Sequence, residues 1–158
     1  MKALKIYSTA IAPEWIDYNG HLRDAYYGLI LSYASDALMD QVGLDSEYRR
    51  TTGCTLYTLE QHMHFLHEIK QSDQLDILVR VLGADRKRIH AAFDFYCARY
   101  KDPVALGEMM LLHVRQDPAP ASVAFPPLIT AALEALVAST SGVEPPGPPS
   151  RRIELRVR

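Results

Sequence analysis

The chemistry that this sequence could support is concentrated in one short polar segment. Asp17, Asn19 and His21 place a carboxylate, an amide and an imidazole around Gly20, and no helical or strand pattern runs through these residues. The segment is therefore predicted to be a loop that presents polar groups. Asp17 could activate a water molecule as a general base, or attack a carbonyl carbon directly as a nucleophile.

The spacing leaves two interpretations of these side chains open. In the functional one, Trp15 and Tyr18 place Asp17 in a partly dry pocket, which would raise the pKa of its carboxyl group. In the structural one, the carboxylate caps a turn that Asn19 helps to shape. His21 likewise has two possible roles. It either acts as a general acid or base or donates a hydrogen bond to a ligand carbonyl, or it holds the loop together by hydrogen bonds.

A long helix is predicted to begin at Arg23 or Asp24, directly after this loop, because an acidic residue suits the first turn of a helix. Apolar residues then recur at helical spacing, and Gly43 is typical of a helix C-terminus. The first N–H groups of a helix lack intrahelical acceptors, so those of Asp24 and Ala25 could stabilise an oxyanion formed from a thioester or ester carbonyl. The Asp24 carboxylate must then point away from that oxyanion.

Period-two patterns flank and follow the helix. They predict strands over residues 4–11, 55–69, 75–82, 89–100 and 104–115. The short polar connectors between the last four suit hairpins, so the sheet should be mainly antiparallel. One long helix covering one face of such a sheet is an α+β arrangement. A short helix over 128–138 completes a domain of residues 1–138, and residues 139–158 form a proline-rich, extended tail.

The strand over 55–69 contains a second candidate base, Glu60. Leu59, Met63 and Phe65 share one parity and should face the helix. The opposite parity carries polar side chains: Thr58, Glu60, His62 and His64. Alternating His and Glu residues can converge on a metal ion, but no fourth ligand is evident, so we expect no metal.

A basic hairpin is predicted between the strands over 75–82 and 89–100. Arg86, Lys87 and Arg88 lie there, and they represent either a solvated turn or a clamp for phosphate groups. The sequence has no glycine-rich phosphate loop and no Gly-x-Ser-x-Gly elbow.

The overall composition limits the class of protein. The 158 residues carry a net charge of −2, which argues against a nucleic-acid partner. The chain shows no apolar run long enough to cross a membrane and no signal-peptide pattern, and it has only two cysteines. We therefore expect one cytoplasmic domain without a membrane partner.

The loop motif resembles a known family. Asp17-Tyr18-Asn19-Gly20-His21-Leu22, followed by Ala25 and Tyr27, is similar to the loop of hotdog-fold acyl-CoA thioesterases of the 4-hydroxybenzoyl-CoA thioesterase type. Further segments resemble the subgroup linked to carnitine dehydrogenases, which acts on betainyl-CoA: Thr58-Leu59-Glu60, Lys87-Arg88-Ile89-His90 and residues 108–114. The family fold is a long central helix wrapped by an antiparallel sheet.

The resemblance implies an acyl-CoA thioesterase without a separate cofactor, since coenzyme A is part of the substrate. The active site would lie in a homodimer or a dimer of dimers. The resemblance also implies that Asp17 is the catalytic carboxylate, a role shared with or taken over by Glu60, and that Asn19 and His21 position the substrate or the loop. Oxyanion or substrate binding is expected at Asp24, Ala25 and Tyr27. Coenzyme A is expected to bind to Arg23, Arg86, Lys87 and Arg88.

Two further points concern the substrate and the rival functions. Five aromatic residues lie near the loop and the first helical turns: Trp15, Tyr18, Tyr26, Tyr27 and Tyr33. They either bind a quaternary ammonium group through their ring faces or belong to the core and the dimer interface. A non-catalytic acyl-CoA-binding protein stays open because Arg23 departs from the asparagine common in the family. A hotdog hydratase is disfavoured, because its Asp-x-Asn-x-x-His motif would place the histidine one residue later than His21.

Overall fold

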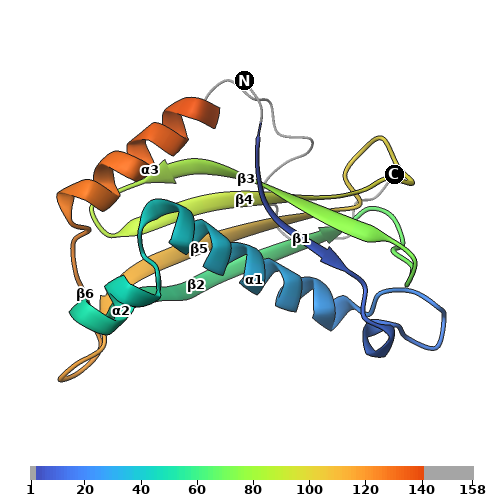
Figure 1. Ribbon diagram of the computed structural model, residues 1–158, viewed down its shortest axis with the longest axis horizontal. Helices are drawn as coiled ribbons and strands as arrows, with labels where there is room; N and C mark the ends of the chain where they lie inside the picture. Colours follow the sequence, from blue (N-terminus) through green and yellow to red (C-terminus); the bar gives the residue numbers. More distant parts are fainter. Residues whose placement is uncertain (1–2, 141–158) are drawn as a thin grey trace, which may run out of the picture.

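The computed structural model describes residues 3–140. One long helix lies across one face of an antiparallel sheet, and a second helix runs beside a strand of that sheet (Figure 1). The elements in chain order are β1 (Leu4–Ala10), η1 (Pro13–Trp15), α1 (Asp24–Val42), α2 (Ser46–Thr52), β2 (Cys54–Phe65), β3 (Gln74–Ala84), β4 (Arg88–Cys97), β5 (Ala105–Arg115), β6 (Ala121–Ser122) and α3 (Pro127–Thr140). The predicted α+β hotdog arrangement is confirmed.

Helix α1 forms where the sequence predicts it. Arg23 is its extended N-cap residue, and Gly43 ends it in the left-handed region at φ 88°. Leu31 and other residues of one helical face are fully buried against the sheet. The contact is close at Gly107 of β5, where a Cβ atom would lie 3.0 Å from the Leu31 side chain. A side chain at position 107 would therefore require the Leu31 side chain to shift by a few tenths of an ångström.

The sheet differs from the predicted series of hairpins. The strand order is β1-β3-β4-β5-β2, and every pairing is antiparallel. The β3–β4 and β4–β5 hairpins are confirmed, whereas β2 pairs with β5 and not with β3. The chain consequently crosses from one side of the sheet to the other between Phe65 and Gln74. The prediction of a strand continuing to residue 69 is wrong, because the segment after Phe65 leaves the sheet.

Two other local predictions are also corrected. Helix α2, for which the sequence analysis predicted no element, lies within residues 45–53; Asp45 caps it by accepting a hydrogen bond from the Tyr48 N–H at 2.8 Å. In β2 the register shifts between Thr58 and Glu60, so that Leu59 is an extra residue and 56% exposed. Leu59 therefore does not face α1 as predicted.

Helix α3 confirms the predicted short C-terminal helix and extends it to Thr140. Ser139 and Thr140, predicted to begin the tail, are helical, and the rest of that prediction, residues 141–158, lies outside the described residues. None of the helices in the described range is long and apolar enough to cross a membrane.

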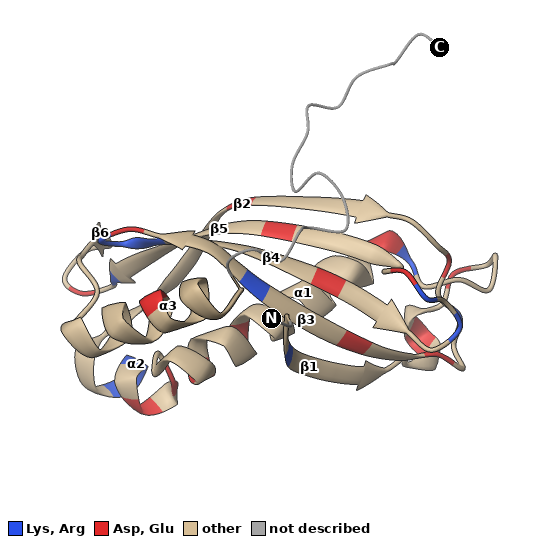
Figure 2. Ribbon diagram, turned by 90° about the horizontal axis from the view of Figure 1, so that it is seen from above, with Lys and Arg blue, Asp and Glu red and all other residues tan. Residues whose placement is uncertain are grey.

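A buried ion pair joins β3 and β4 on the sheet face opposite α1. Arg80 donates to both carboxylate oxygens of Asp94, at 3.1 and 2.8 Å, and both side chains are only 4% exposed. Figure 2 shows that the long strands carry only a few bands of charged residues and are otherwise uncharged. Removing one partner would leave the other charge buried and unpaired, which is costly.

The Asp94→Asn variant should therefore lose about 3–5 kcal/mol of unfolding free energy, measured by denaturant titration. The matched control is Asp76→Asn, which weakens an ion pair with Lys5 whose side chains are 56% and 43% exposed. That exposed pair should contribute less than about 1 kcal/mol. Equal losses in the two variants would contradict the assignment of Arg80–Asp94 as the energetically important pair.

Candidate active site

The loop before α1 is closed by the side chain and the backbone of Asp17. One carboxylate oxygen, Oδ1, accepts hydrogen bonds from the Asn19 N–H at 2.8 Å and from the His21 N–H at 3.2 Å. The Asp17 backbone also bonds to His21 and Gly20, and Gly20 takes a positive φ of 78° that suits glycine. Asp17 thus shapes the turn, while no described residue bonds to its second oxygen, Oδ2.

These bonds determine the charge of the Asp17 carboxyl group. The hydrogen bond from the His21 N–H lowers the pKa of Asp17, with further lowering from the Asn19 N–H and from the positive charges of His21 and Arg23. The raised pKa that belonged to the functional interpretation of Asp17 is therefore wrong. The carboxylate is ionised at neutral pH and is a weak base, which favours direct attack by Oδ2 over general-base catalysis.

The start of α1 offers a free backbone donor beside this carboxylate. The Arg23 N–H donates to the Trp15 carbonyl at 3.0 Å, and the Ala25 N–H donates to the Asp24 side chain at 2.9 Å. Within residues 3–140 the Asp24 N–H has no acceptor. This N–H lies at the positive end of the helix dipole, where it could donate to a carbonyl oxygen that gains negative charge.

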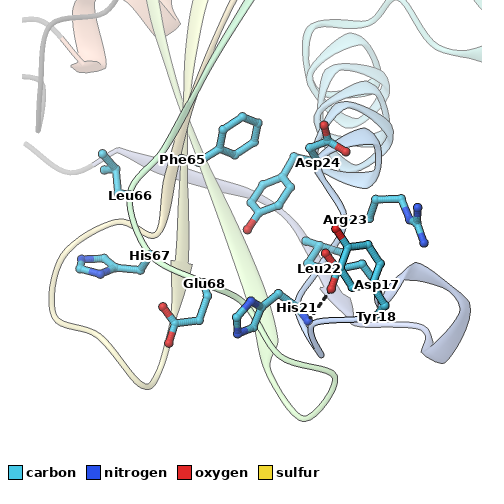
Figure 3. Close-up of a pocket in the computed structure, with 11 residues that line it drawn as sticks. Asp17, Tyr18, His21, Leu22, Arg23, Asp24, Phe65, Leu66, His67 and Glu68 are labelled. Atoms are coloured by element: carbon cyan, nitrogen blue, oxygen red, sulfur yellow. Dashed lines mark hydrogen bonds between the residues drawn. The ribbon is translucent and has the colours of Figure 1, made fainter.

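A cavity of about 560 Å³ lies between this loop and the segment that follows β2. In Figure 3, Phe65, Leu66, His67 and Glu68 form one side, and the loop with His21 forms the other. The two sides are tied together by a hydrogen bond of 2.8 Å from the Leu22 N–H to the Ile69 carbonyl.

A second layer of contacts holds the wall in place. Arg99 donates to the Glu68 carbonyl at 2.8 Å and to both carboxylate oxygens of Asp73 at 2.7 Å. This pairing lowers the pKa of Asp73. The ring of Tyr100 stacks on His67, with 4.3 Å between centroids. Leu66, His67 and Glu68 are therefore fixed although they lie outside the sheet.

The cavity is acidic and partly aromatic. Its lining contains the carboxylates of Asp17, Asp24 and Glu68 against one guanidinium, that of Arg23, and none of these four side chains forms an ion pair within the described range. A hydrogen bond from its own N–H lowers the pKa of Glu68, so this carboxylate is ionised as well. The aromatic lining consists of Tyr18, Tyr27 and Phe65.

The predicted site residues are only partly brought together. Of these, Asp17, His21, Arg23, Asp24 and Tyr27 line the cavity. Asn19 does not line it and instead holds Asp17, while the Ala25 N–H is already occupied. Among the proposed ammonium-binding aromatics, Trp15 stacks on Tyr26 at 5.5 Å and Tyr33 contacts Tyr7 at 6.0 Å, all away from the cavity lining.

Glu60, the second candidate base, does not line this cavity. It lines a second cavity of about 230 Å³ together with His62, His90 and Glu108, on the sheet face opposite α1. Glu60 and Asp17 therefore do not meet within one chain. In residues 3–140, no three or more His, Cys, Asp or Glu side chains are arranged to hold a metal ion.

The basic hairpin also lies far from the cavity. It follows the end of β3, an eleven-residue strand that spans roughly 35 Å from the side where the cavity lies. Arg88 pairs with Asp85 at 2.6 Å, Lys87 donates to Ser122 at 3.0 Å, and the Arg86 carbonyl accepts from Phe125 at 2.9 Å. Of the four residues predicted to bind coenzyme A, only Arg23 is at the cavity.

The cavity wall contains residues that the sequence reasoning did not select, above all Leu66, His67 and Glu68. They were assigned to a continuing strand. The available signal was the adjacent apolar pair Phe65–Leu66, which breaks the period-two alternation.

Comparison with known proteins agrees with this architecture. Residues 11–133 match the thioesterase-like superfamily. The chain is 47% identical over 135 residues to the betainyl-CoA thioesterase of Pseudomonas aeruginosa, covering 85% of this chain and 84% of that protein. It is 38% identical over 145 residues to the L-carnitine dehydrogenase/betainyl-CoA thioesterase of Agrobacterium fabrum, covering 90% of this chain but only 29% of that longer protein.

A solved structure gives the same result. A crystal structure of a candidate thioesterase from Pseudomonas putida KT2440 superimposes with a TM-score of 0.87 at 40% identity, over 99% of both chains. The fold and the cavity beside the start of α1 thus define a hotdog-type thioesterase domain. The chain belongs to the thioesterase-like superfamily, and the protein is a thioester hydrolase. The predicted family and reaction type are confirmed.

If Asp17 is the reacting carboxylate, Asp17→Asn should lower kcat for thioester hydrolysis by about 100-fold or more, because the amide is neither nucleophile nor base. Free thiol release measures this rate. Glu60→Gln is the matched carboxylate-to-amide control in the second cavity, and its kcat should stay close to that of the wild type. A large loss in Glu60→Gln with an active Asp17→Asn would reverse the assignment.

Proposed function

We propose that the protein hydrolyses a small acyl-CoA, betainyl-CoA, to betaine and free coenzyme A. The acidic and aromatic lining of the cavity is the observation that carries the proposal. A trimethylammonium group has no N–H to donate, so proteins bind it through negative charge and aromatic faces. The relatives named as betainyl-CoA thioesterases support the same substrate.

The thioester would be placed with its carbonyl at the start of α1. The Asp24 N–H donates to the carbonyl oxygen, and Asp17 Oδ2 attacks the carbonyl carbon. The C–S bond breaks, coenzyme A leaves as the thiolate, and an acyl-aspartyl anhydride forms. Water then hydrolyses this anhydride, which releases betaine and restores Asp17. His21 lines the cavity and positions the carbonyl, while Asn19 keeps the loop closed.

Arg23 is proposed to contact the coenzyme A phosphates. It is exposed at the cavity, and no described carboxylate pairs with it. The guanidinium is free to bind phosphate with two parallel hydrogen bonds. We place the protein in the cytoplasm, where Cys54 and Cys97, which form no disulfide in the described chain, remain reduced.

We also propose that the protein is a homodimer joined along β2, with a dimer of dimers as the larger possibility. Strand β2 lies at the edge of the sheet, pairs only with β5 among the described strands, and is twelve residues long. Tyr57 and Leu59 on this strand are 37% and 56% exposed. A long edge strand with exposed apolar residues is suited to pairing with a second copy.

The substrate proposal predicts a specific ratio of rates. Betainyl-CoA and 3,3-dimethylbutyryl-CoA have acyl groups of the same shape, but only the first carries a positive charge. The wild-type kcat/KM should be about tenfold or more higher for betainyl-CoA, since the cation interaction is worth roughly 1–2 kcal/mol. Glu68→Gln should reduce this ratio, whereas Glu134→Gln, an exposed site on α3, should leave it unchanged.

Thiol release from both esters, with acetyl-CoA as a third substrate, measures this ratio. A preference for the neutral ester would overturn betainyl-CoA as the substrate while leaving the thioesterase assignment intact. Binding of all three esters without any cleavage would instead favour the non-catalytic acyl-CoA-binding alternative.

The dimer proposal predicts a solution mass of twice the 17.8 kDa chain, or of four chains, by light scattering coupled to gel filtration. Leu59→Lys should shift the equilibrium toward monomer, because charge on an edge strand opposes pairing. Leu128→Lys is the control, since Leu128 is 85% exposed on α3. A monomeric wild type, or equal effects of the two variants, would exclude β2 as the interface.

A further inference from the structure

Tyr27 occupies the first turn of α1 and is the most buried aromatic residue of the cavity lining, at 4% exposure. Its ring is held by two others. Phe65 meets it edge-on, with 4.9 Å between centroids and an angle of 76°, and Phe95 lies at 6.3 Å. The position of the hydroxyl group is therefore fixed by packing.

The hydroxyl group of Tyr27 has no intramolecular partner in the described part of the chain. A buried tyrosine normally satisfies its O–H with a hydrogen bond. This oxygen is also not sealed in the core. Among residues 3–140, the polar side-chain atoms that are fully enclosed and lack a partner are Arg80 Nη1 and Glu108 Oε2, and the Tyr27 oxygen is not one of them. The Tyr27 hydroxyl thus opens into the cavity that the residue lines.

Helix geometry places Tyr27 on the same face of α1 as the residue that carries the free backbone donor. Tyr27 follows Asp24 by three positions, so the two lie on the same face of α1. Helical side chains point back toward the N-terminus and cover the preceding turn. Both residues line the same cavity, to which Tyr27 presents its unpaired hydroxyl and Asp24 its unpaired N–H.

The protonation state suits a donor. Burial raises the pKa of Tyr27 to about 12, with smaller electrostatic contributions from Cys97, Asp73 and Glu68. The group stays an O–H throughout the neutral range. It can donate a hydrogen bond to an anionic oxygen but does not give up its proton at neutral pH.

We propose that the Tyr27 hydroxyl is a second oxyanion donor, which binds the thioester carbonyl oxygen together with the Asp24 N–H. The inference rests on the proposed function and adds a catalytic residue to the same site. As Asp17 Oδ2 bonds to the carbonyl carbon, the C=O π electrons move to oxygen, and both donors stabilise the resulting charge. When the carbonyl re-forms, the C–S bond breaks and the thiolate leaves, while the tyrosine proton stays in place.

Tyr27 could instead serve only through the face of its ring, against the trimethylammonium group. The two roles separate cleanly, because Tyr27→Phe removes the hydroxyl and keeps the ring. Since the hydroxyl bonds to no described residue, the Phe variant should fold with an unchanged Tm. Tyr33→Phe is the matched control on the same helix; its ring contacts Tyr7 and is not part of the cavity lining.

For Tyr27→Phe we expect kcat to fall by about 100-fold, the usual cost of removing one oxyanion donor. KM should change by less than about threefold, because the interaction strengthens only as charge develops. The loss should be the same for betainyl-CoA, 3,3-dimethylbutyryl-CoA and acetyl-CoA, whichever of them the wild type cleaves. Tyr33→Phe should retain wild-type kcat.

A spectroscopic measurement separates a direct hydrogen bond from a structural effect. With a non-hydrolysable methyl ketone analogue of acetyl-CoA, the infrared C=O stretch of the bound ketone should shift to higher frequency in Tyr27→Phe than in the wild type. An unchanged stretch, a kcat close to wild type, or a loss confined to KM for betainyl-CoA would overturn the inference. If the wild type cleaves none of the three esters, the proposed function fails first and the inference fails with it.

Discussion

The site depends on one hydrogen bond, from the Leu22 N–H to the Ile69 carbonyl at 2.8 Å. Both residues are almost completely buried, so neither backbone group could exchange this bond for water. On one side of the bond lies the loop that carries Asp17 and leads into α1; on the other lies the wall that carries Phe65 and Glu68. The bond thus fixes the distance between the Asp17 carboxylate, the proposed nucleophile, and the surface that faces it. Arg99 reinforces the wall by bonding Glu68 and Asp73 at once.

In the proposed mechanism, one side chain, that of Asp17, has both a structural and a chemical role. Its Oδ1 accepts the Asn19 and His21 N–H groups, which shapes the loop, while its Oδ2 has no partner among the described residues. The same bonds that hold the carboxylate lower its pKa, so precise placement is gained at the expense of basicity. An ionised, immobilised oxygen is suited to attack a carbonyl held at a helix start, where positioning replaces much of the intrinsic reactivity. The two interpretations left open by the sequence are therefore compatible.

What could be predicted from the sequence follows the range of the interactions involved. Helix α1, its start at Asp24 and its end at Gly43 depend on local periodicity and caps, and they were predicted correctly. The pairing of β2 with β5 is non-local, and the short polar segment 70–73 resembles a hairpin connector, so the crossover was missed. That error also hid His67 and Glu68, since a residue outside the sheet was counted as part of a strand. The bulge at Leu59 reversed the parity within β2, a change that alternation alone does not reveal. Helix α2 was missed despite visible caps at Asp45 and Gly53.

The charges of the site would also orient the proposed substrate. Betainyl-CoA is cationic at its acyl end and anionic at its phosphates, and the cavity lining combines three carboxylates with a single guanidinium. The acidic interior attracts the ammonium group and repels the phosphates, so the substrate can bind productively in only one direction. Arg23, exposed at the cavity, is placed to take the phosphate end. An acidic interior nevertheless opposes an oxyanion, which makes donors at the carbonyl more important here than in a neutral site. The Asp24 N–H and the Tyr27 hydroxyl would offset this repulsion at the atom where the negative charge develops.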